Sequence, residues 1–306
     1  MIPSPSNNQD SDTEQAVDIA DIGISNVNVV VHGFGLYLLS SITTKDVQHW
    51  LLIGLSASEV LKNILTQITT FPDVLNDANV DLDVLNDVAE DLDTQLNIYI
   101  KFFNDYGVTA LSYVSMFFIT LEPLLKIKLS DYSKHCNEKR VKYLLLATGL
   151  CSLIIPTALA GAYHANGGEA GKIIEFFSID ENSDSEFVVY AQPCLDILFV
   201  LLSMVTYYNI FRNNMRSQNK LSSQALTSVL LALSFILFTV VPDLTSSYYE
   251  ISEVEIPYSL EKARDLIFKF NDLASAVIYI FTQDTVRNMM SQKLGLQRLC
   301  GASNNR

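Results

Sequence analysis

Long apolar blocks alternate with polar or charged segments along the whole chain. Several blocks approach the ~20 apolar residues that a helix needs to cross a bilayer. The run 143–165 carries no charged side chain, whereas a helix at the surface of a soluble bundle would keep a polar face. The pattern therefore predicts an all-α protein, a bundle of seven transmembrane helices. The blocks lie at about residues 24–44, 50–71, 98–121, 142–163, 187–210, 222–242 and 264–281.

The third block lies within 99–129, and we expect the other helices to surround it. It carries Asp105 among aromatic residues near its start and Glu122 beside a basic segment near its end. A helix rises about 1.5 Å per residue, so the uncharged run 106–121 and its flanks can cross the hydrocarbon layer. We therefore expect Asp105 to lie inside the helix assembly and Glu122 at the inner water boundary.

Basic residues are concentrated on one side of the predicted membrane. The segments after the first, third, fifth and seventh spans hold 14 of the 20 Lys and Arg residues, although the net charge of the chain is −14. Lys and Arg in short loops stay cytoplasmic. The asymmetry predicts a multi-pass protein of the cell membrane with an extracellular N-terminus and a cytoplasmic C-terminus.

Both ends of the chain differ in composition from the apolar middle. We expect three parts: an acidic, solvated extracellular tail at 1–21, the seven-helix domain at 22–284, and an amphipathic cytoplasmic helix and tail at 285–306. Cys300, near the C-terminus, is a candidate for lipidation. Four scattered cysteines predict neither a disulfide framework nor a metal site.

Several segments resemble motifs of the rhodopsin-like (class A) G-protein-coupled receptors. ITLEPLLKIKLSDYSKHCNEKRVK is similar to the end of their third helix and the inner loop that follows it, LSASEVL to the acidic motif of their second helix, and FNDLASAVIYIF to the box of their seventh helix. The resemblance implies an extracellular small-molecule or peptide ligand and a heterotrimeric G protein as partners. It places Glu122, Pro123 and Tyr279 on the side that faces the G protein.

The chain departs from the family at positions that matter for activation. Pro123 stands where the box of the third helix has arginine, and Val240 stands where the sixth helix normally has tryptophan. Ser275 and Ala276 replace the Asn and Pro of the seventh-helix box, although Tyr279 is present.

Charged residues at membrane depth cost several kcal/mol unless they are paired or hydrated, so each is a functional hypothesis. By the resemblance, Asp105 matches the acid that amine receptors use for an ammonium group, and Lys269 matches the lysine that binds retinal in opsins. We expect Asp105 and Lys269 to form the floor of a ligand site, with Tyr106 and Asp196 as further ligand residues. The alternatives are a structural Asp105–Lys269 ion pair and a retinal pigment.

A second polar set resembles the family's mid-membrane cluster of sodium and water. Its members are Glu59, Ser112, Asn271 and Ser275, and Asp272 is expected to join them. Lys62, one helical turn after Glu59, offers an internal cation, so we expect pairing of Lys62 rather than a bound sodium ion.

The sequence thus favours a receptor that transmits an extracellular signal, carried by an amine or a basic peptide, to an intracellular G protein. An ion- or proton-coupled seven-span transporter or channel is the alternative, because it would use the same buried charges. No phosphate loop, nucleophile motif or histidine-rich metal pattern predicts an enzyme, and nothing predicts nucleic-acid binding. The four histidines are expected at the membrane interfaces.

Overall fold

The computed structural model describes residues 7–77, 100, 103–129, 131–165, 192–217, 222–252, 254, 256 and 258–294. Within them the chain is all-α, as the sequence predicts. The elements are α1 (Asn7–Ser41), α2 (Val47–Asp77), η1 (Phe103–Val108), α4 (Thr109–Lys128), α5 (Tyr132–His135), α6 (Glu138–Ala165), α8 (Gln192–Ser217), α9 (Ser223–Phe235), η3 (Ile236–Val240), α10 (Val241–Ile251), α11 (Tyr258–Thr282) and α12 (Asp284–Lys293).

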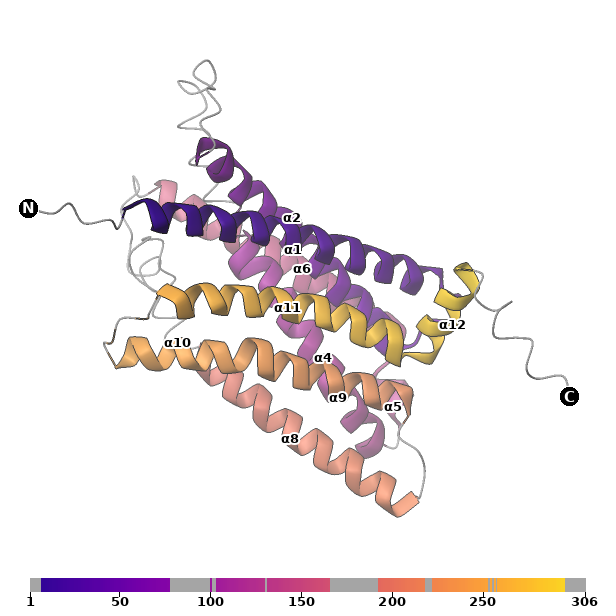
Figure 1. Ribbon diagram of the computed structural model, residues 1–306. Coiled ribbons are helices and arrows are strands. Elements are labelled where there is room, and N and C mark those ends of the chain that lie inside the picture. The colour runs from indigo at the N-terminus through magenta and orange to yellow at the C-terminus, as the bar shows by residue number, and fades with distance from the viewer. Residues whose placement is uncertain are drawn as a thin grey trace, which may run out of the picture.

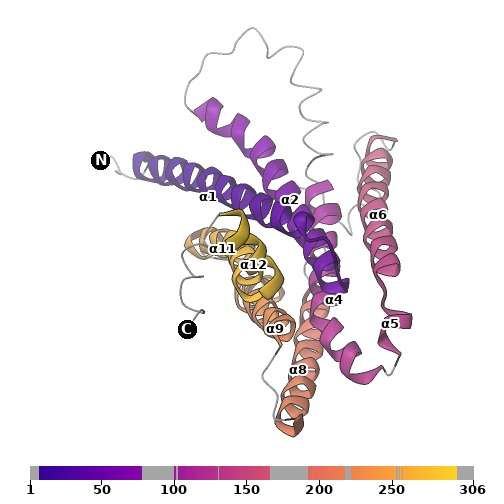
Figure 2. The same cartoon turned by 90° about the vertical axis from the view of Figure 1, so that its right-hand side faces the viewer.

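Helix α4 lies at the centre of the bundle. It packs against α2, α6, α8 and α9, while α1 packs against both α2 and α11, and α11 packs against α9. Figures 1 and 2 show the long helices side by side, with α1 starting at one end of the bundle and α12 turned across the other end. The expectation that the third apolar block organises the bundle is confirmed.

Four helices are long and apolar enough to cross a membrane, among the residues that the structure describes. They cover Ile22–Ser41, Thr109–Lys128, Pro193–Met215 and Ser223–Tyr249. Large apolar side chains also cover the outer face of α8, where Leu198, Met204 and Phe211 are more than half exposed. Apolar patches of this kind are unusual on a soluble monomer and suit contact with lipid. The structure thus indicates a multi-pass membrane protein.

The N-terminal segment departs from the expected solvated tail. Helix α1 begins at Asn7 and runs without interruption into the first apolar block. Acidic residues in the first turns of a helix are stabilised by the positive end of its dipole, so an acidic composition does not prevent helix formation here. Residues 7–21, expected as an acidic, solvated tail, are thus part of a helix.

Two π-helical segments interrupt the α-helical geometry. In η3 the N–H of Val241 donates to the carbonyl of Ile236, five residues back, directly before Pro242. Proline lacks an N–H and disturbs the preceding turn, and the wider π turn accommodates it. The expected irregularity at Pro242 is therefore present, whereas α4 continues through Pro123 to Lys128.

The helix expected after the seventh span is present as α12. It covers Asp284–Lys293, and its side chain Val286 is buried against the bundle. Cys300 and the rest of the predicted tail lie outside the described residues, as does the greater part of the loop between α2 and η1.

Candidate functional site

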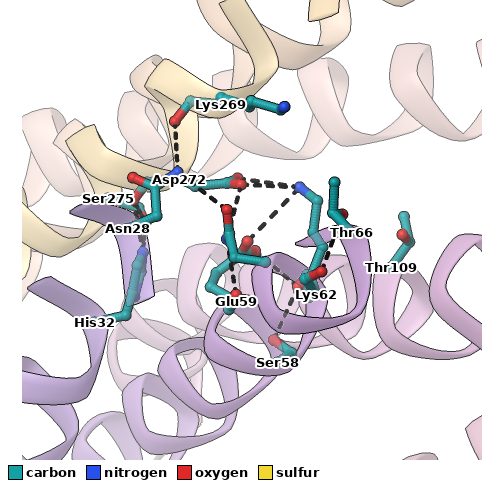
Figure 3. A network of polar contacts seen from close by, with 12 residues as sticks. Asn28, His32, Ser58, Glu59, Lys62, Thr66, Thr109, Lys269, Asp272 and Ser275 are labelled. Atoms are coloured by element: carbon teal, nitrogen blue, oxygen red, sulfur yellow. Dashed lines mark hydrogen bonds and ion pairs between the residues drawn. The ribbon is translucent and has the colours of Figure 1, made fainter. Parts of the chain in front are cut away.

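A buried ionic cluster joins α2 to α11 near the middle of the bundle. The ammonium of Lys62 lies 3.1 Å from both carboxylate oxygens of Asp272 and 3.7 Å from Oε2 of Glu59. Both carboxylates are almost completely buried, and the lysine side chain is 29% exposed. The pairing of Lys62 predicted from the sequence is confirmed, and it brings together Glu59, Lys62 and Asp272 (Figure 3).

Helix α4 contributes to the same cluster through Ser112. The Ser112 hydroxyl lies 2.8 Å from Oε1 of Glu59 and 2.8 Å from Oγ of Ser58. Because helical positions 59 and 62 share one face of α2, a single helix face presents Ser58, Glu59 and Lys62 to its neighbours. The cluster therefore ties together the three helices whose motifs resemble the receptor family.

Helix α1 adds three side-chain interactions that sequence reasoning missed. Asn28 donates to Oδ1 of Asn63, at 3.3 Å, and to the carbonyl of Lys269, at 3.1 Å. His32 lies 2.7 Å from the carbonyl oxygen of Asp272 and is fully buried, so its expected interfacial position is wrong. A signal was available: Asn28 and His32 stand four residues apart on one face of an apolar helix.

The tautomer of His32 follows from its partner. A carbonyl oxygen only accepts hydrogen bonds, so Nε2 of His32 carries a proton and donates a hydrogen bond to the backbone carbonyl of Asp272. Nδ1 of His32 has no hydrogen-bond partner among the described residues. The cluster thus brings together the ammonium of Lys62, the carboxyl groups of Glu59 and Asp272, and the imidazole of His32.

The remaining predicted core residues lie next to this cluster on α11. Ser275 donates to the carbonyl of Asp272 at 2.8 Å. Asn271 accepts from the hydroxyl of Ser234 at 3.1 Å, so it connects α11 to α9 rather than to Lys62. No group of three His, Cys, Asp or Glu side chains that could bind a metal ion occurs in the described part of the chain. The ammonium of Lys62 lies between the carboxyl groups of Glu59 and Asp272, in the polar cluster where the sequence suggests either a sodium ion or Lys62.

The predicted ligand residues are only partly described. Asp105 and Tyr106 belong to η1, but their side chains, and with them the Asp105–Lys269 pair, lie outside what the structure describes. Lys269 is half-buried on α11. Asp196 on α8 is fully buried, and nearby Tyr113 donates to Asp243 of α10 at 3.3 Å. Asp243 is therefore a further acidic residue at this level that the sequence did not single out.

Tyr279 lies at the junction of α1, α2 and α11. It is fully buried, and its hydroxyl accepts a hydrogen bond of 2.9 Å from Ser56. Gly35 of α1 faces it so closely that a Cβ at this position would collide with the Tyr279 ring and hydroxyl. Tyr279 is thus held in a fixed position by a small residue on the neighbouring helix.

A second polar network closes the α12 end of the bundle. Gln48 donates to the carbonyl of Gln224 at 3.0 Å and to Ser228 at 2.9 Å, and it accepts from Gln283 at 2.8 Å. His49 contacts the hydroxyl of Thr285 at 2.7 Å. The start of α9 is in this way connected to α2, α11 and α12.

Glu122 connects α4 to the segment that follows it. Its Oε1 lies 2.6 Å from the ammonium of Lys126 and accepts from the hydroxyl of Tyr132 at 2.8 Å. Lys126 also donates to Gln224 at 2.8 Å. Burial and the neighbouring Glu122 carboxylate raise the pKa of Tyr132 above its usual value, so the phenol stays protonated and continues to donate. Pro123 is buried beside this pair.

Asp46, the residue before α2, caps that helix. Its Oδ1 accepts from the backbone N–H of His49 at 2.9 Å, and its Oδ2 accepts from Gln224. Burial acts to raise the pKa of Asp46, but the hydrogen bonds and charge of His49, with the charge of Lys126, outweigh it and lower the pKa to about 2.

The lowered pKa of Asp46 predicts a loss of stability in acid. Since the pKa is lower in the folded state than the ordinary 3.8, the stabilisation is complete above about pH 5 and is lost as the pH falls towards 2. The side chain is 39% exposed, so we expect about 1 kcal/mol after allowance for solvent screening. Thermal unfolding of the purified protein at pH 5 and pH 3 would measure it: the advantage of the wild type over Asp46→Asn should shrink in acid, and an equal difference at both pH values would contradict the assignment.

No protein-family model matches this chain, and no curated protein matches it either.

Proposed function

We propose that the chain is a divergent seven-span cell-surface receptor that transmits an extracellular signal to a heterotrimeric G protein. The observation that carries this proposal is the buried Glu59–Lys62–Asp272 cluster, which connects α2 and α11 at mid-bundle together with Ser112 of α4. Each of these helices holds one of the motifs that resemble the rhodopsin-like receptors.

The proposal counts three spans beyond the four long apolar helices. Glu59 and Lys62 of α2 and Asp272 of α11 belong to the buried cluster, where they contact each other rather than lipid. In α6 the run 143–165 has no Asp, Glu, Lys or Arg, and Leu146, Leu150 and Ile154 are exposed on its surface. Lipid-facing apolar residues and inward-facing charges are the arrangement expected of spanning helices.

The ligand is proposed to bind at the end of the bundle opposite α12. Asp196 of α8 supplies a buried carboxylate there, Asp243 of α10 supplies a partly buried one, and Asp105 lies in η1. A carboxylate at membrane depth is well suited to an ammonium group. An amine or a basic peptide is therefore the proposed ligand class, and it would favour one of two arrangements of the inner helix ends.

G-protein activation in transfected cells tests the receptor. Cells expressing the full chain would be exposed to a panel of amines and basic peptides, with wild type compared with Asp105→Asn at equal surface expression. We expect the response of the variant to be at least tenfold weaker, because about one charged hydrogen bond to the ligand is lost. Silence of the wild type at the cell surface would contradict coupling.

A transporter or channel is the second candidate, favoured by the buried carboxyl groups of Glu59 and Asp272 and by Nδ1 of His32, which has no partner among the described residues. Groups of this kind take up protons in membrane proteins that move them. Flux of H⁺ or Na⁺ into proteoliposomes that hold the purified chain would favour the transporter. Proteoliposomes without such flux, together with a G-protein response in cells, would favour the receptor.

A further inference from the structure

A pocket of about 230 Å³ opens at the α12 end of the bundle, outside the buried cluster. It lies between the α1–α2 connection, the last turns of α4 and the α5 segment. Residues that line it and matter here are Lys45, Asp46, Glu122, Lys126, Tyr132 and Cys136. Under the proposed topology this end faces the cytoplasm.

Glu122 supplies an unsatisfied acceptor in the wall of this pocket. Only 2% of the residue is exposed, and Oε1 already pairs with the ammonium of Lys126 and accepts a hydrogen bond from Tyr132. Oε2 has no hydrogen-bond partner among the described residues. A buried acceptor without a partner costs about 1–3 kcal/mol, and more when it is charged, so a donor at this oxygen would recover substantial free energy.

The two lysines of the pocket do not meet this need. The ammonium of Lys45 donates to the carbonyls of Ser40 and Ile42, at 3.0 and 2.6 Å, where it completes the end of α1. Lys126 is shared between Glu122 Oε1 and Gln224. Both cations therefore have internal partners, whereas Oε2 of Glu122 has none among the described residues.

The size of the pocket limits its occupant. Sites for drug-sized ligands usually exceed about 300 Å³, so a pocket of about 230 Å³ suits one side chain or one small cation. An N–H donor with positive charge pairs best with a carboxylate, since charge-assisted hydrogen bonds are about twice as strong as neutral ones.

We propose that this pocket binds a guanidinium or primary ammonium group from the cytoplasmic side, held by Oε2 of Glu122. The group would come from a basic side chain of a cytoplasmic protein or from a free small cation. The location of the site on the cytoplasmic side rests on the proposed receptor topology, whereas binding itself does not.

Trp50 is a natural reporter for this site. It is the one tryptophan of the chain, and its ring lies 5.7 Å from the ammonium of Lys45 and 4.1 Å from that of Lys142. Lys142 in turn pairs with Glu138, a residue of the pocket, at 2.5 Å. A cation that enters the pocket should therefore change the emission of Trp50.

The experiment is a fluorescence titration of the purified full chain with ethylguanidinium, with neutral ethylurea as the matched probe. We expect a saturable change with ethylguanidinium only, and at least a tenfold weaker affinity in Glu122→Gln, since one charged hydrogen bond is lost. Asp131→Asn, an exposed acid of the same segment paired with Lys134, should bind as the wild type does. Equal affinities of wild type and Glu122→Gln would overturn the proposal.

A second measurement needs no substitution at Glu122. Burial and the Glu122 carboxylate raise the pKa of Cys136, so its alkylation is followed at pH 9, peptide by peptide, in the wild-type chain. Ethylguanidinium should slow the alkylation of Cys136 severalfold and leave Cys151 and Cys194, which are exposed and do not line the pocket, unchanged. No protection together with no saturable fluorescence change would overturn the site.

The source of the cation is distinguished by a peptide pair. Gly-Arg-Gly amide is compared with its citrulline analogue and with ethylguanidinium. Tighter binding of the arginine peptide than of ethylguanidinium would assign the site to a protein side chain, and weaker binding would assign it to a free cation. These assays use neither an extracellular ligand nor a G protein, so their failure is separate from a failure of the proposed receptor function.

Discussion

Lys62→Met is expected to lower the stability of the folded bundle by about 3 kcal/mol, because removal of one partner from a buried ion pair leaves the others uncompensated. Two carboxylates, Glu59 and Asp272, would then face each other without the ammonium that lies 3.1 Å from the second of them. The partial exposure of Lys62 places the effect at the lower end of the usual range. Thermal unfolding of the detergent-purified chain would measure it.

Two variants serve as controls for Lys62→Met. Lys62→Met combined with Asp272→Asn leaves one carboxylate in place of two, so it should recover a large part of the lost stability. Lys142→Met removes an exposed pair with Glu138 and should cost less than about 1 kcal/mol. A Lys62→Met protein that unfolds at the wild-type temperature would show that the cluster carries no stabilising interaction.

Gly107→Ala is expected to destabilise the contact between η1 and α6 by about 1–3 kcal/mol, the usual cost of overpacking. A Cβ at Gly107 would collide with the backbone carbonyl of Ser152 and would also crowd the ring of Phe103. A backbone atom cannot rotate away, so α6 would have to shift. The melting temperature of the variant should fall accordingly.

Gly149→Ala is the matched control on the facing helix. No atom lies within 4 Å of a Cβ built at Gly149, which sits inside α6. Alanine is favoured over glycine in a helix by about 1 kcal/mol, so this variant should be as stable as the wild type or more so. Loss of stability in both variants would indicate that the close approach at Gly107 is not the cause.

The buried cluster and the closed α12 end together suggest how a signal would cross the bundle. Asp272 and Tyr279 lie on the same helix, α11, about two turns apart, and Gln283, the residue that follows this helix, contacts Gln48. A ligand that displaced α11 near Lys269 would therefore act on both networks through one rigid element. This remains part of the proposed function, and the cellular assay with Asp105→Asn addresses it.

The apolar and polar pattern of the sequence determined the helical class and the positions of the long helices. Among the described residues, helices cover most of each of the seven apolar blocks. In an apolar environment the backbone N–H and C=O groups must bond to each other, and a helix satisfies them within one segment. The spacing of Glu59 and Lys62 on one face also predicted their pairing. Among the residues that the structure describes, four helices are long and apolar enough to cross a membrane.

Only the tertiary structure decided which polar residues from different helices meet. Asn28 and His32 look like isolated polar residues in an apolar span, and nothing local shows that they face the backbone of α11. Likewise Asp46, Gln48 and Gln224 are ordinary loop and helix-end residues until α2 and α9 are placed side by side. Helix periodicity defines which face a side chain occupies, whereas the rotation and neighbours of each helix depend on the packing of the whole bundle.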